Sequence, residues 1–568
     1  MLSHLKLFTG SVALIFGLIL NQNAVAQKTT ITIKGNIHLT KENEWDIDEC
    51  CFYYDDILSA KPVVIPIRRD TAGNYEVSFS IEHYHQVYFG KGQNRQGLSI
   101  YDTHMRYFTF FVKPGQKMGI NFVQTPRKLK FSGDFAMENQ QYQAYEDARD
   151  LGVKNIYQGV INKKLSPDEI KQHALNAFKE QLKFNSQYFK THPATKFVKD
   201  QAYYQALYEP QSVAINFNFS SGNNITEAMV TDFYKAMKMT GNTFADRPGL
   251  SVAATDANPS LKNAAALGND RYKNFLNSYY FTLQKNLVRP KTMGASKNEI
   301  ATFVLEKHPD VKDDYRAVLN KVQAKTDLDA ADTKTMDKIE QLYIQEILTI
   351  KSNQIALDQL LEIKDPALRD INATMYLYRK LEINKLGEIE PLIESYKKKV
   401  QNTYLKNTFL TAYNAQLDRL HNSKLSLLSV MNSAEGWTGP DLLKNLLAKY
   451  KGKVVYLDIW ATWCVPCIAN MPPSAKLREK FKGKDVVFIY ACLNSPSQTN
   501  WKNLVAEQKI EGENYFFDQI QSASIGKALN IKAFPTYALI DKNGNIVNKD
   551  ANKPGELKTI EEINLLLQ

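Results

Sequence analysis

The chain has 568 residues, 44% of them hydrophobic and 23% charged, which is the composition of ordinary globular protein and predicts about three domains. Its formal net charge of +11 is spread along the sequence, which argues against a nucleic-acid binding protein and suits solubility and weak attraction to anionic membrane surfaces. Five cysteines are too few for a disulfide-stapled exported scaffold of this size.

Residues 1–26 have the features of a cleaved signal peptide. Lys6 precedes an apolar run that ends at Leu20, and Ala24-Val25-Ala26 supplies the small-x-small pattern that signal peptidase reads. The run is short for a membrane span, so we expect cleavage before Gln27 rather than an uncleaved anchor. We find no second apolar stretch long enough to cross a bilayer. The sequence therefore predicts an exported protein.

Residues 28–135 are expected to form an all-β domain. Thr30-Ile31-Thr32-Ile33-Lys34 and Tyr75-Glu76-Val77-Ser78-Phe79 alternate apolar and polar side chains, and Tyr107-Phe108-Thr109-Phe110-Phe111 is a more apolar strand. Turn residues at Asp70-Thr71-Ala72-Gly73-Asn74 punctuate the pattern. The prediction is a small sandwich or barrel-like module.

Residues 136–430 change to a helical period and are expected to form an all-α domain. Ser166-Pro167-Asp168-Glu169 is a helix start, with a serine cap, a proline in the first turn and an acid that reaches back to the cap. Further helices are expected at Met336–Lys351, Asp365–Ile383 and Ile389–Gln401. The region shows neither a repeat period nor a catalytic motif. It is interpreted as a helical spacer or docking domain.

Residues 435–568 alternate strands and helices and are expected to form an α/β domain with a mixed sheet. The predicted strands are the apolar runs Val454–Trp460, Asp485–Cys492 and Thr536–Asp541, the last of them followed by a hairpin turn at Asn543-Gly544. The predicted helices are Pro466–Phe481, Asn500–Gln508 and Glu556–Leu567.

The chemistry is expected at Cys464-Val465-Pro466-Cys467, which follows the first of these strands. A disulfide that closes so small a ring gains only about 2 kcal/mol from chain entropy, so a structural staple explains the pair poorly. Pro466 suits the first turn of a helix. The sulfur of Cys464 would then face unpaired N–H groups and the positive end of the helix dipole, which lower the pKa of a thiol. Thiol–disulfide exchange needs such an exposed thiolate, and Cys467 is placed to resolve the mixed disulfide.

The flanking residues resemble a known family. Asp458-Ile459-Trp460-Ala461-Thr462-Trp463-Cys464-Val465-Pro466-Cys467 looks like the thioredoxin active-site stretch, and Pro472 matches the proline that kinks the active-site helix. Phe534-Pro535-Thr536 matches the cis-proline loop, which in that family faces the cysteines and docks an extended substrate segment. The long insertion between Cys467 and Pro535 is similar to the TlpA-type branch of exported oxidoreductases, which is related to peroxiredoxins. The β-rich N-terminal region also resembles the small domain that often precedes TlpA-type domains.

Two departures and two retained residues qualify the resemblance. Many TlpA-type proteins have an acid where this chain has Asn470, and their domain begins with a hairpin where this chain has the helical-looking segment Pro440–Lys449. Asp458 is retained, and a carboxyl on a buried strand has a raised pKa that allows it to relay a proton to and from Cys467. The alternative is an aspartate that is merely satisfied by hydrogen bonds. Trp463 either shields the sulfur pair and contacts substrate, or it only packs against its neighbours.

The remaining cysteines and two histidines are weaker candidates for a functional role. Cys492 ends an apolar strand and is interpreted as an inert core thiol. Cys50 and Cys51 either form a strained adjacent disulfide, accept electrons from the CxxC pair, or have neither role. His83 and His85 share one face of a predicted strand without a third ligand, so a structural role is favoured over a metal site. We expect neither a metal nor a cofactor.

These residues predict a periplasmic thiol–disulfide oxidoreductase that acts on protein thiols and disulfides. Cys464 would be the attacking sulfur, Cys467 the resolving thiol and Asp458 the proton carrier, while Trp463 and Phe534-Pro535-Thr536 hold the substrate backbone. The resemblance implies the reducing direction, a membrane reductase as electron donor, and roles in cytochrome c maturation or thiol rescue. A disulfide oxidase or isomerase, a thiol peroxidase, and a non-catalytic envelope binding protein with a thioredoxin-like module stay open, as do the physiological substrate and the oligomeric state.

Overall fold

The computed structural model of the chain divides into two compact units, which are described separately. The described residues are 29–37, 50–59, 62–81, 83–91, 108–124, 127–153, 165–220, 268–287, 293–308, 311–364, 366–383, 386–437, 439, 441–495 and 498–568. The first unit comprises Met1–Val288, Leu360–Met375 and Val400–Asn407, and the second comprises Arg289–Gln359, Tyr376–Lys399 and Thr408–Gln568. The expected signal peptide lies outside the described residues. Within them, no helix combines the length and apolar character that a membrane span requires.

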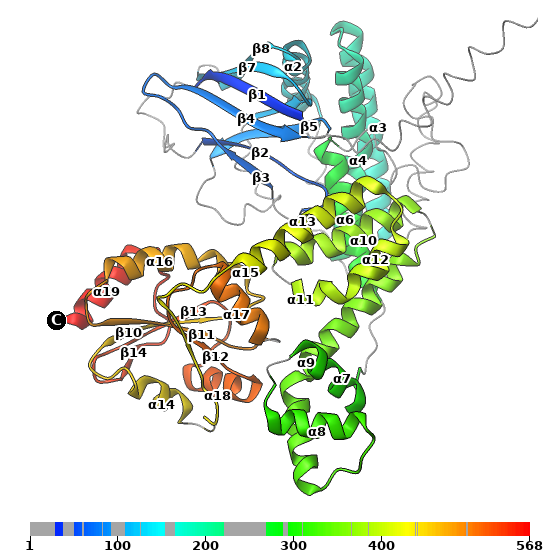
Figure 1. The fold of residues 1–568 in the computed structure, drawn as a ribbon. Coiled ribbons are helices and arrows are strands. Elements are labelled where there is room, and N and C mark those ends of the chain that lie inside the picture. The colour runs from blue at the N-terminus through cyan, green and yellow to red at the C-terminus, as the bar shows by residue number, and fades with distance from the viewer. Residues whose placement is uncertain are drawn as a thin grey trace, which may run out of the picture. The chain divides into compact units, whose positions relative to one another are not determined.

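The first unit begins with a β-sandwich (Figure 1). One sheet has the order β4-β1-β7-β8 and the other β3-β2-β5-β6. Their inward side chains, among them Ile33, Phe52 and Phe110, share one hydrophobic core. The predicted all-β region is therefore confirmed as a two-sheet sandwich. Its strands are β1 (Thr29–Asn36), β2 (Cys50–Tyr54), β3 (Val63–Pro66), β4 (Asn74–Ile81), β5 (His85–Lys91), β6 (Phe108–Val112), β7 (Lys117–Gln124) and β8 (Arg127–Gly133).

Helices follow the sandwich, as the sequence predicts. In the first unit they are α2 (Ala136–Gly152), α3 (Pro167–Thr191), α4 (Lys196–Ser220) and α6 (Asp270–Asn286). The start of α3 is the predicted one. Ser166 accepts from the backbone N–H of Glu169, and the Glu169 carboxylate accepts from the backbone N–H of Ser166.

The central helices are shared between the two units. They are α7 (Lys297–Lys307), α8 (Asp313–Gln323), α9 (Ala330–Leu361), α10 (Pro366–Glu382), α11 (Leu386–Ile389), the 3₁₀ turn η8 (Glu390–Leu392), α12 (Ile393–Lys399) and α13 (Thr403–Asn422). Helices α9, α10 and α13 each contain residues of both units. The helix expected at Ile389–Gln401 is instead broken into short pieces, because Pro391 at the start of η8 has no N–H to continue the helical bonding.

The second unit ends in an α/β domain built on a six-stranded mixed sheet of order β14-β13-β10-β11-β12-β9. Strands β9, β10, β11 and β12 are parallel to one another, whereas β13 is antiparallel to β10 and β14 is antiparallel to β13. The strands are β9 (Ser429–Asn432), β10 (Val454–Trp460), β11 (Val486–Cys492), β12 (Gly512–Phe516), β13 (Thr536–Ile540) and β14 (Ile546–Asn548). Helices α15 (Val465–Ala469), α16 (Met471–Lys480), α17 (Gln498–Glu507) and α19 (Leu557–Leu567) cover one face, and α14 (Leu442–Ala448) and α18 (Gln519–Leu529) cover the other (Figure 1).

Two details of this domain differ from the expectation. The edge strand β9 precedes residue 435, where the domain was expected to begin, because a four-residue strand with partly exposed side chains carries little sequence pattern. The helix expected at Pro466–Phe481 is divided at Asn470 into two helices rather than continuous, and Pro472, which was expected to kink it, lies in the first turn of the second one. Proline without an N–H cannot continue the bonding of α15.

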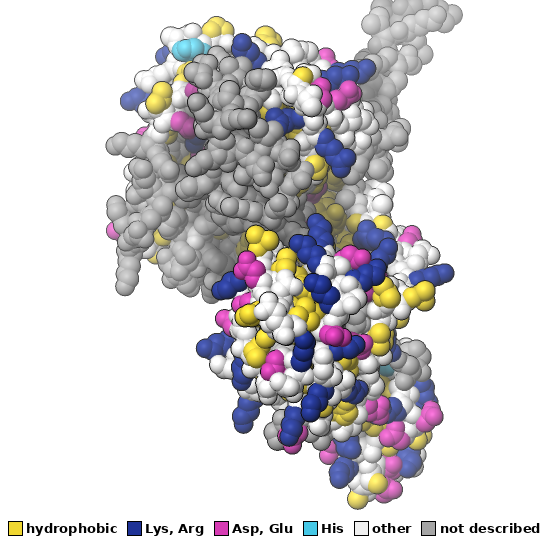
Figure 2. Space-filling view, turned by 90° about the vertical axis from the view of Figure 1, so that its left-hand side faces the viewer, with side chains coloured by type: hydrophobic (Ala, Val, Ile, Leu, Met, Phe, Trp, Pro, Cys, Tyr) yellow, Lys and Arg dark blue, Asp and Glu magenta, His cyan; other side chains and the backbone are white. Residues whose placement is uncertain are grey.

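The charged surface agrees with the distribution seen in the sequence. On the face shown in Figure 2, Lys and Arg side chains lie interspersed with Asp and Glu over the described residues. On the described part of that face, the two signs of charge are therefore mixed.

Candidate active site

The two cysteines lie between the carboxyl end of β10 and the start of α15, and they form a disulfide. Cys464 is the N-cap residue of α15, and its sulfur accepts a hydrogen bond from the backbone N–H of Cys467 at 3.2 Å. Pro466 occupies the first turn, where a missing N–H costs nothing. The sulfur thus faces the helix start as predicted, an arrangement that favours a negative charge on it after reduction.

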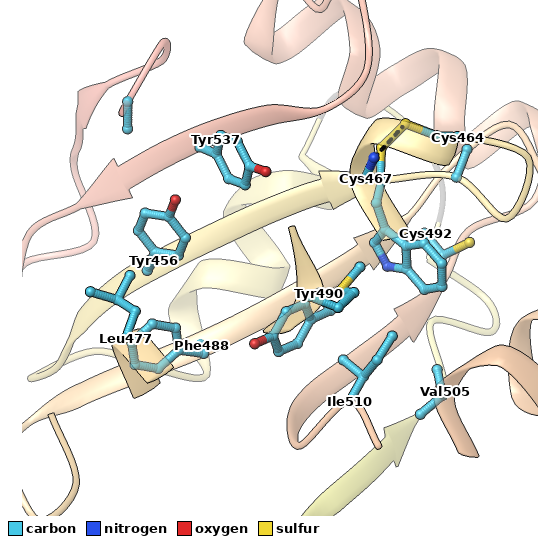
Figure 3. Packing of buried hydrophobic residues seen from close by; sticks show 14 of the residues in the cluster. Tyr456, Cys464, Cys467, Leu477, Phe488, Tyr490, Cys492, Val505, Ile510 and Tyr537 are labelled. Atoms are coloured by element: carbon cyan, nitrogen blue, oxygen red, sulfur yellow. Dashed lines mark hydrogen bonds between the residues drawn. A yellow bond between two sulfur atoms is a disulfide. The ribbon is translucent and has the colours of Figure 1, made fainter. Parts of the chain in front are cut away.

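The disulfide is less accessible than we expected from the sequence. Cys464 is 3% exposed and Cys467 is 1% exposed. Both side chains belong to the hydrophobic cluster on this face of the sheet (Figure 3). Cys464 is covered because its sulfur turns onto the helix start and is bonded to Cys467. Little of either cysteine is therefore accessible to a partner in the oxidised state.

An aromatic pair flanks the cysteines. Trp463 is 41% exposed, and its ring meets that of Phe534 edge to face with 5.5 Å between centroids. Phe534 precedes Pro535 through a cis peptide bond, and Thr536 Oγ1 donates to the backbone oxygen of Ala533 at 2.7 Å. The structure therefore brings the predicted cis-proline loop beside the tryptophan that precedes the first cysteine.

Asp458 lies in the middle of β10, on the same face of the sheet as Tyr456 and Trp460. It is 1% exposed, and among the described residues neither of its carboxyl oxygens has a hydrogen-bond partner. Burial raises the pKa of this carboxyl to about 8. The alternative considered from the sequence, an aspartate satisfied by hydrogen bonds, is therefore not what the structure shows.

Sequence reasoning missed the tyrosines around this carboxyl. Tyr490 on β11 and Tyr537 on β13 are the register partners of Asp458 on its two sides. Tyr456 stacks on Tyr537 with 5.6 Å between ring centroids. The signal that could have found Tyr537 is the strand alternation after Pro535, which turns every second side chain inward.

Ser495 and Cys492 form a small polar cluster with the backbone just before Cys464. Ser495 Oγ accepts a hydrogen bond from the backbone N–H of Thr462 at 2.9 Å and lies 3.1 Å from the sulfur of Cys492. Burial raises the pKa of Cys492 to about 12. Cys492 is thus an inert thiol that helps to seat the loop.

The other two cysteines do not form the adjacent disulfide considered from the sequence. Cys50 and Cys51 are both buried thiols. Successive residues of an extended strand point to opposite faces of the sheet. Cys50 accordingly packs in the sandwich core and Cys51 packs against tyrosines outside it. Burial, followed by the neighbouring Cys50, raises the pKa of Cys51 to about 12.

The two histidines lie close together, with 4.3 Å between ring centroids. His85 begins β5, whereas His83 precedes the strand rather than sharing its face as expected. Burial and the charge of Lys273 lower the pKa of His83 to about 4. Within the described part of the chain, no group of three or more His, Cys, Asp or Glu side chains could hold a metal ion.

Comparison with known proteins connects this domain to relatives. The Redoxin family matches residues 441–564. The thiol-disulfide oxidoreductase ResA of Geobacillus kaustophilus is 30% identical over 122 residues, 20% of this chain and 67% of the relative. ResA of Bacillus cereus is 32% identical over 129 residues, 22% of this chain and 72% of the relative. A solved putative thiol-disulfide oxidoreductase from Bacteroides vulgatus shares 35% identity over 21% of this chain and 83% of its own, with a TM-score of 0.20.

A cysteine pair at a helix start, on a mixed α/β sheet and beside a cis-proline loop, defines the class of thioredoxin-like thiol–disulfide oxidoreductases. Protein thiols and disulfides are the substrates of this class. The chain belongs to the Redoxin family, as a thiol–disulfide oxidoreductase of the ResA and TlpA type with its family domain at the C-terminal end.

Proposed function

We propose that the protein is exported and acts in the periplasm as a protein-disulfide reductase through Cys464 and Cys467. The observation that carries this proposal is the N-cap position of Cys464, whose sulfur accepts the N–H of Cys467 and so is stabilised as a thiolate when the pair is reduced. The signal-peptide features of residues 1–26 support export. The resemblance to the TlpA-type family supports the reducing direction.

The reaction takes two exchanges. The thiolate of Cys464 attacks one sulfur of a client disulfide, the client S–S bond breaks, and one client thiolate leaves. The carboxylate of Asp458 then takes the proton of Cys467, and the Cys467 sulfur attacks Cys464. The second client thiolate leaves and takes a proton from water. Two electrons have passed to the client, and the cysteine pair has reached the disulfide state of this structure.

The client is proposed to lie along Trp463 and the Phe534-Pro535-Thr536 loop. The exposed indole provides a flat apolar surface beside the sulfurs, and the loop carries backbone groups next to it. Aromatic rings contribute much contact area with little loss of conformational freedom. This arrangement suits an extended client segment that carries an apolar residue near its cysteine.

The direction of electron flow is proposed to be set by a membrane reductase that returns the pair to its dithiol form. Cytochrome c maturation and rescue of wrongly oxidised thiols are the processes that such a reductase would serve. A reduction potential below about −230 mV, the lower edge of the glutaredoxin range, supports the reducing role. A value well above about −200 mV indicates an oxidase or isomerase instead.

The order of attack is tested by trapping. In a Cys467→Ser variant the mixed disulfide cannot be resolved, so client proteins should accumulate on Cys464 and be identified by mass spectrometry after non-reducing separation. The matched control is Cys464→Ser, which should trap none. A folded Cys467→Ser variant that captures no client, or a Cys464→Ser variant that captures as many, contradicts the proposal.

A further inference from the structure

Asp458 and Tyr537 face each other across the antiparallel pair of β10 and β13. Residues directly opposite in such a pair have Cβ atoms about 5 Å apart on the same face. Tyr537 is 3% exposed, and its hydroxyl makes no hydrogen bond of ordinary geometry within the described residues, as is true of both Asp458 oxygens. Figure 3 shows the hydroxyl end of Tyr537 pointing toward the Cys464–Cys467 pair.

The neighbouring tyrosines are already engaged. Tyr456 donates its hydroxyl hydrogen to the backbone oxygen of Asn552 at 2.9 Å. The hydroxyl of Tyr490 is paired with Ser474 Oγ at 2.8 Å and accepts from Arg478 Nη1 at 3.3 Å. Of the three phenols on this face, Tyr537 is thus the one whose donor is available to the site.

The charges around this hydroxyl are few. Asp458, Tyr490 and Glu556 raise the pKa of Tyr537 after burial, which is the largest cause, and the Asn470 side chain lowers it by acting as a hydrogen-bond donor toward the phenol oxygen, which leaves the O–H of Tyr537 without an acceptor. Because the pKa stays well above its ordinary value, the hydroxyl keeps its proton at any physiological pH and acts only as a hydrogen-bond donor. Asn470 carries no charge, so the polar group that contacts Tyr537 from the helix side is neutral.

A buried donor without an acceptor and a buried carboxyl without a donor are rare in folded proteins. Their placement opposite each other, on the face of the sheet that also carries the cysteine pair, indicates that they pair in another state of the site. In the oxidised state the carboxyl is protonated at neutral pH, because its pKa is about 8, and the neutral acid needs no donor. After reduction the carboxylate that receives the proton of Cys467 needs one.

We propose that Tyr537 is a positioning residue for this oxidoreductase, whose hydroxyl donates a hydrogen bond to the Asp458 carboxylate while that carboxylate takes the proton of Cys467. The inference rests on the proposed function, in which Asp458 is the proton acceptor. The proton moves from the Cys467 sulfur to a carboxyl oxygen, and Tyr537 retains its own proton throughout. A hydrogen bond to the ionised form stabilises that form, so Tyr537 keeps Asp458 basic at a lower pH than burial alone allows.

The test is the pH dependence of resolution in the full chain. The mixed disulfide of Cys464 with a small aromatic thiol is prepared, and release of the thiol is followed from pH 5 to 10. In Tyr537→Phe, the midpoint of the rate profile should move up by about one pH unit, and the rate at pH 6 should fall about tenfold because fewer carboxyls are ionised. Tyr456→Phe, which removes the hydroxyl of the ring stacked on Tyr537, should retain the wild-type midpoint. Equal midpoints in the two variants would overturn the inference.

Two further arms separate this inference from the proposed function. In Asp458→Asn, the titration step of the carboxyl should disappear, which leaves only the rise in rate that accompanies ionisation of the Cys467 thiol itself. If this step disappears in Asp458→Asn but the midpoint of Tyr537→Phe equals that of Tyr456→Phe, only the inference about Tyr537 fails. If Asp458→Asn retains the wild-type profile, the proposed role of Asp458 fails as well. Where Tyr537→Phe does not fold, 3-fluorotyrosine at position 537 serves, since its more acidic hydroxyl should lower the midpoint, and an unchanged midpoint contradicts the inference.

Discussion

The indole Nε1 of Trp463 donates a hydrogen bond of 2.7 Å to the backbone oxygen of Asn494. Asn494 follows β11 and has a positive φ of 49°, and its own N–H donates to Ser522 Oγ at 3.0 Å at the start of α18. The most exposed ring of the site is therefore held at its nitrogen by a loop that a second helix holds in turn. The aromatic surface beside the cysteines is preorganised rather than loose.

Removal of the Trp463 ring should weaken client binding more than it slows the chemistry. In Trp463→Ala, we expect KM for an unfolded protein disulfide to rise roughly three- to tenfold, since the exposed indole is the proposed client contact and an aromatic contact contributes about 0.5–1.5 kcal/mol beyond its area. Trp463→Phe keeps an aromatic ring but lacks the Nε1 donor, so its KM should lie between those of the wild type and Trp463→Ala. Steady-state kinetics of disulfide reduction measure both, and an unchanged KM in Trp463→Ala would show that the indole is only packing.

The backbone of Asn494 provides a test of that support. A β-branched side chain is disfavoured at positive φ, whereas glycine adopts it without strain. Asn494→Val should therefore lose roughly 1–2 kcal/mol of stability and shift the fluorescence of Trp463, while Asn494→Gly should leave both nearly unchanged. Thermal unfolding and emission spectra of the two variants make the comparison. Identical behaviour would mean that the loop conformation does not hold the indole.

Asp458 should reduce the stability of the oxidised domain as the pH rises. Its folded pKa of about 8 lies above the ordinary value of 3.8, so the native state holds a proton that the unfolded state releases. Stability is therefore lost between about pH 4 and pH 8, by a few kcal/mol in all. Asp458→Asn should match wild type near pH 4 and exceed it increasingly toward pH 8.

This stability difference can be followed by tryptophan fluorescence, because four of the five tryptophans lie in the C-terminal domain: Trp437, Trp460, Trp463 and Trp501. A melting-temperature difference between the two proteins that stays constant from pH 4 to pH 8 would show that the carboxyl is not protonated in the folded state.

Thiol titration should distinguish the cysteine classes. The oxidised native protein should present no rapidly reacting thiol to Ellman's reagent, because the three cysteines outside the disulfide are buried. Three should react in guanidinium chloride. Cys492→Ala should retain exchange activity, since its high pKa leaves almost no thiolate. A fast-reacting native thiol would place one of the three among the functional residues.

The reacting pair was predictable from the sequence because the features that define it are local. The CxxC spacing, the proline in the first helical turn and the apolar strand before it lie within a few residues, and Asp458 is at a fixed offset on that strand. Local spacing cannot show which side chains of other strands meet this carboxyl. Tyr490 and Tyr537 are placed by strand order and register, which depend on the pairing of segments far apart in the chain.

The prediction of helices and strands has the same limit, because local patterns do not show long-range pairing. The buried strand β10 was predicted with its observed bounds, and the helix expected at Met336–Lys351 is the middle part of the longer α9. Strand β9 was missed, because its pairing with β12 rather than its composition makes it part of the sheet. The hydrogen bond from the Trp463 indole to the backbone oxygen of Asn494 cannot be predicted from residue type, apart from the preference of asparagine for positive φ.

The backbone of Asp458 is fixed on both sides, by β11 and by β13. Oxidation or reduction of the cysteine pair is therefore not expected to move the backbone of β10 at Asp458. What can change beneath the cysteine pair is whether the Asp458 carboxyl is protonated and how its side chain is rotated. On the proposed mechanism, oxidation of the cysteine pair therefore changes the protonation of this carboxyl without moving its strand.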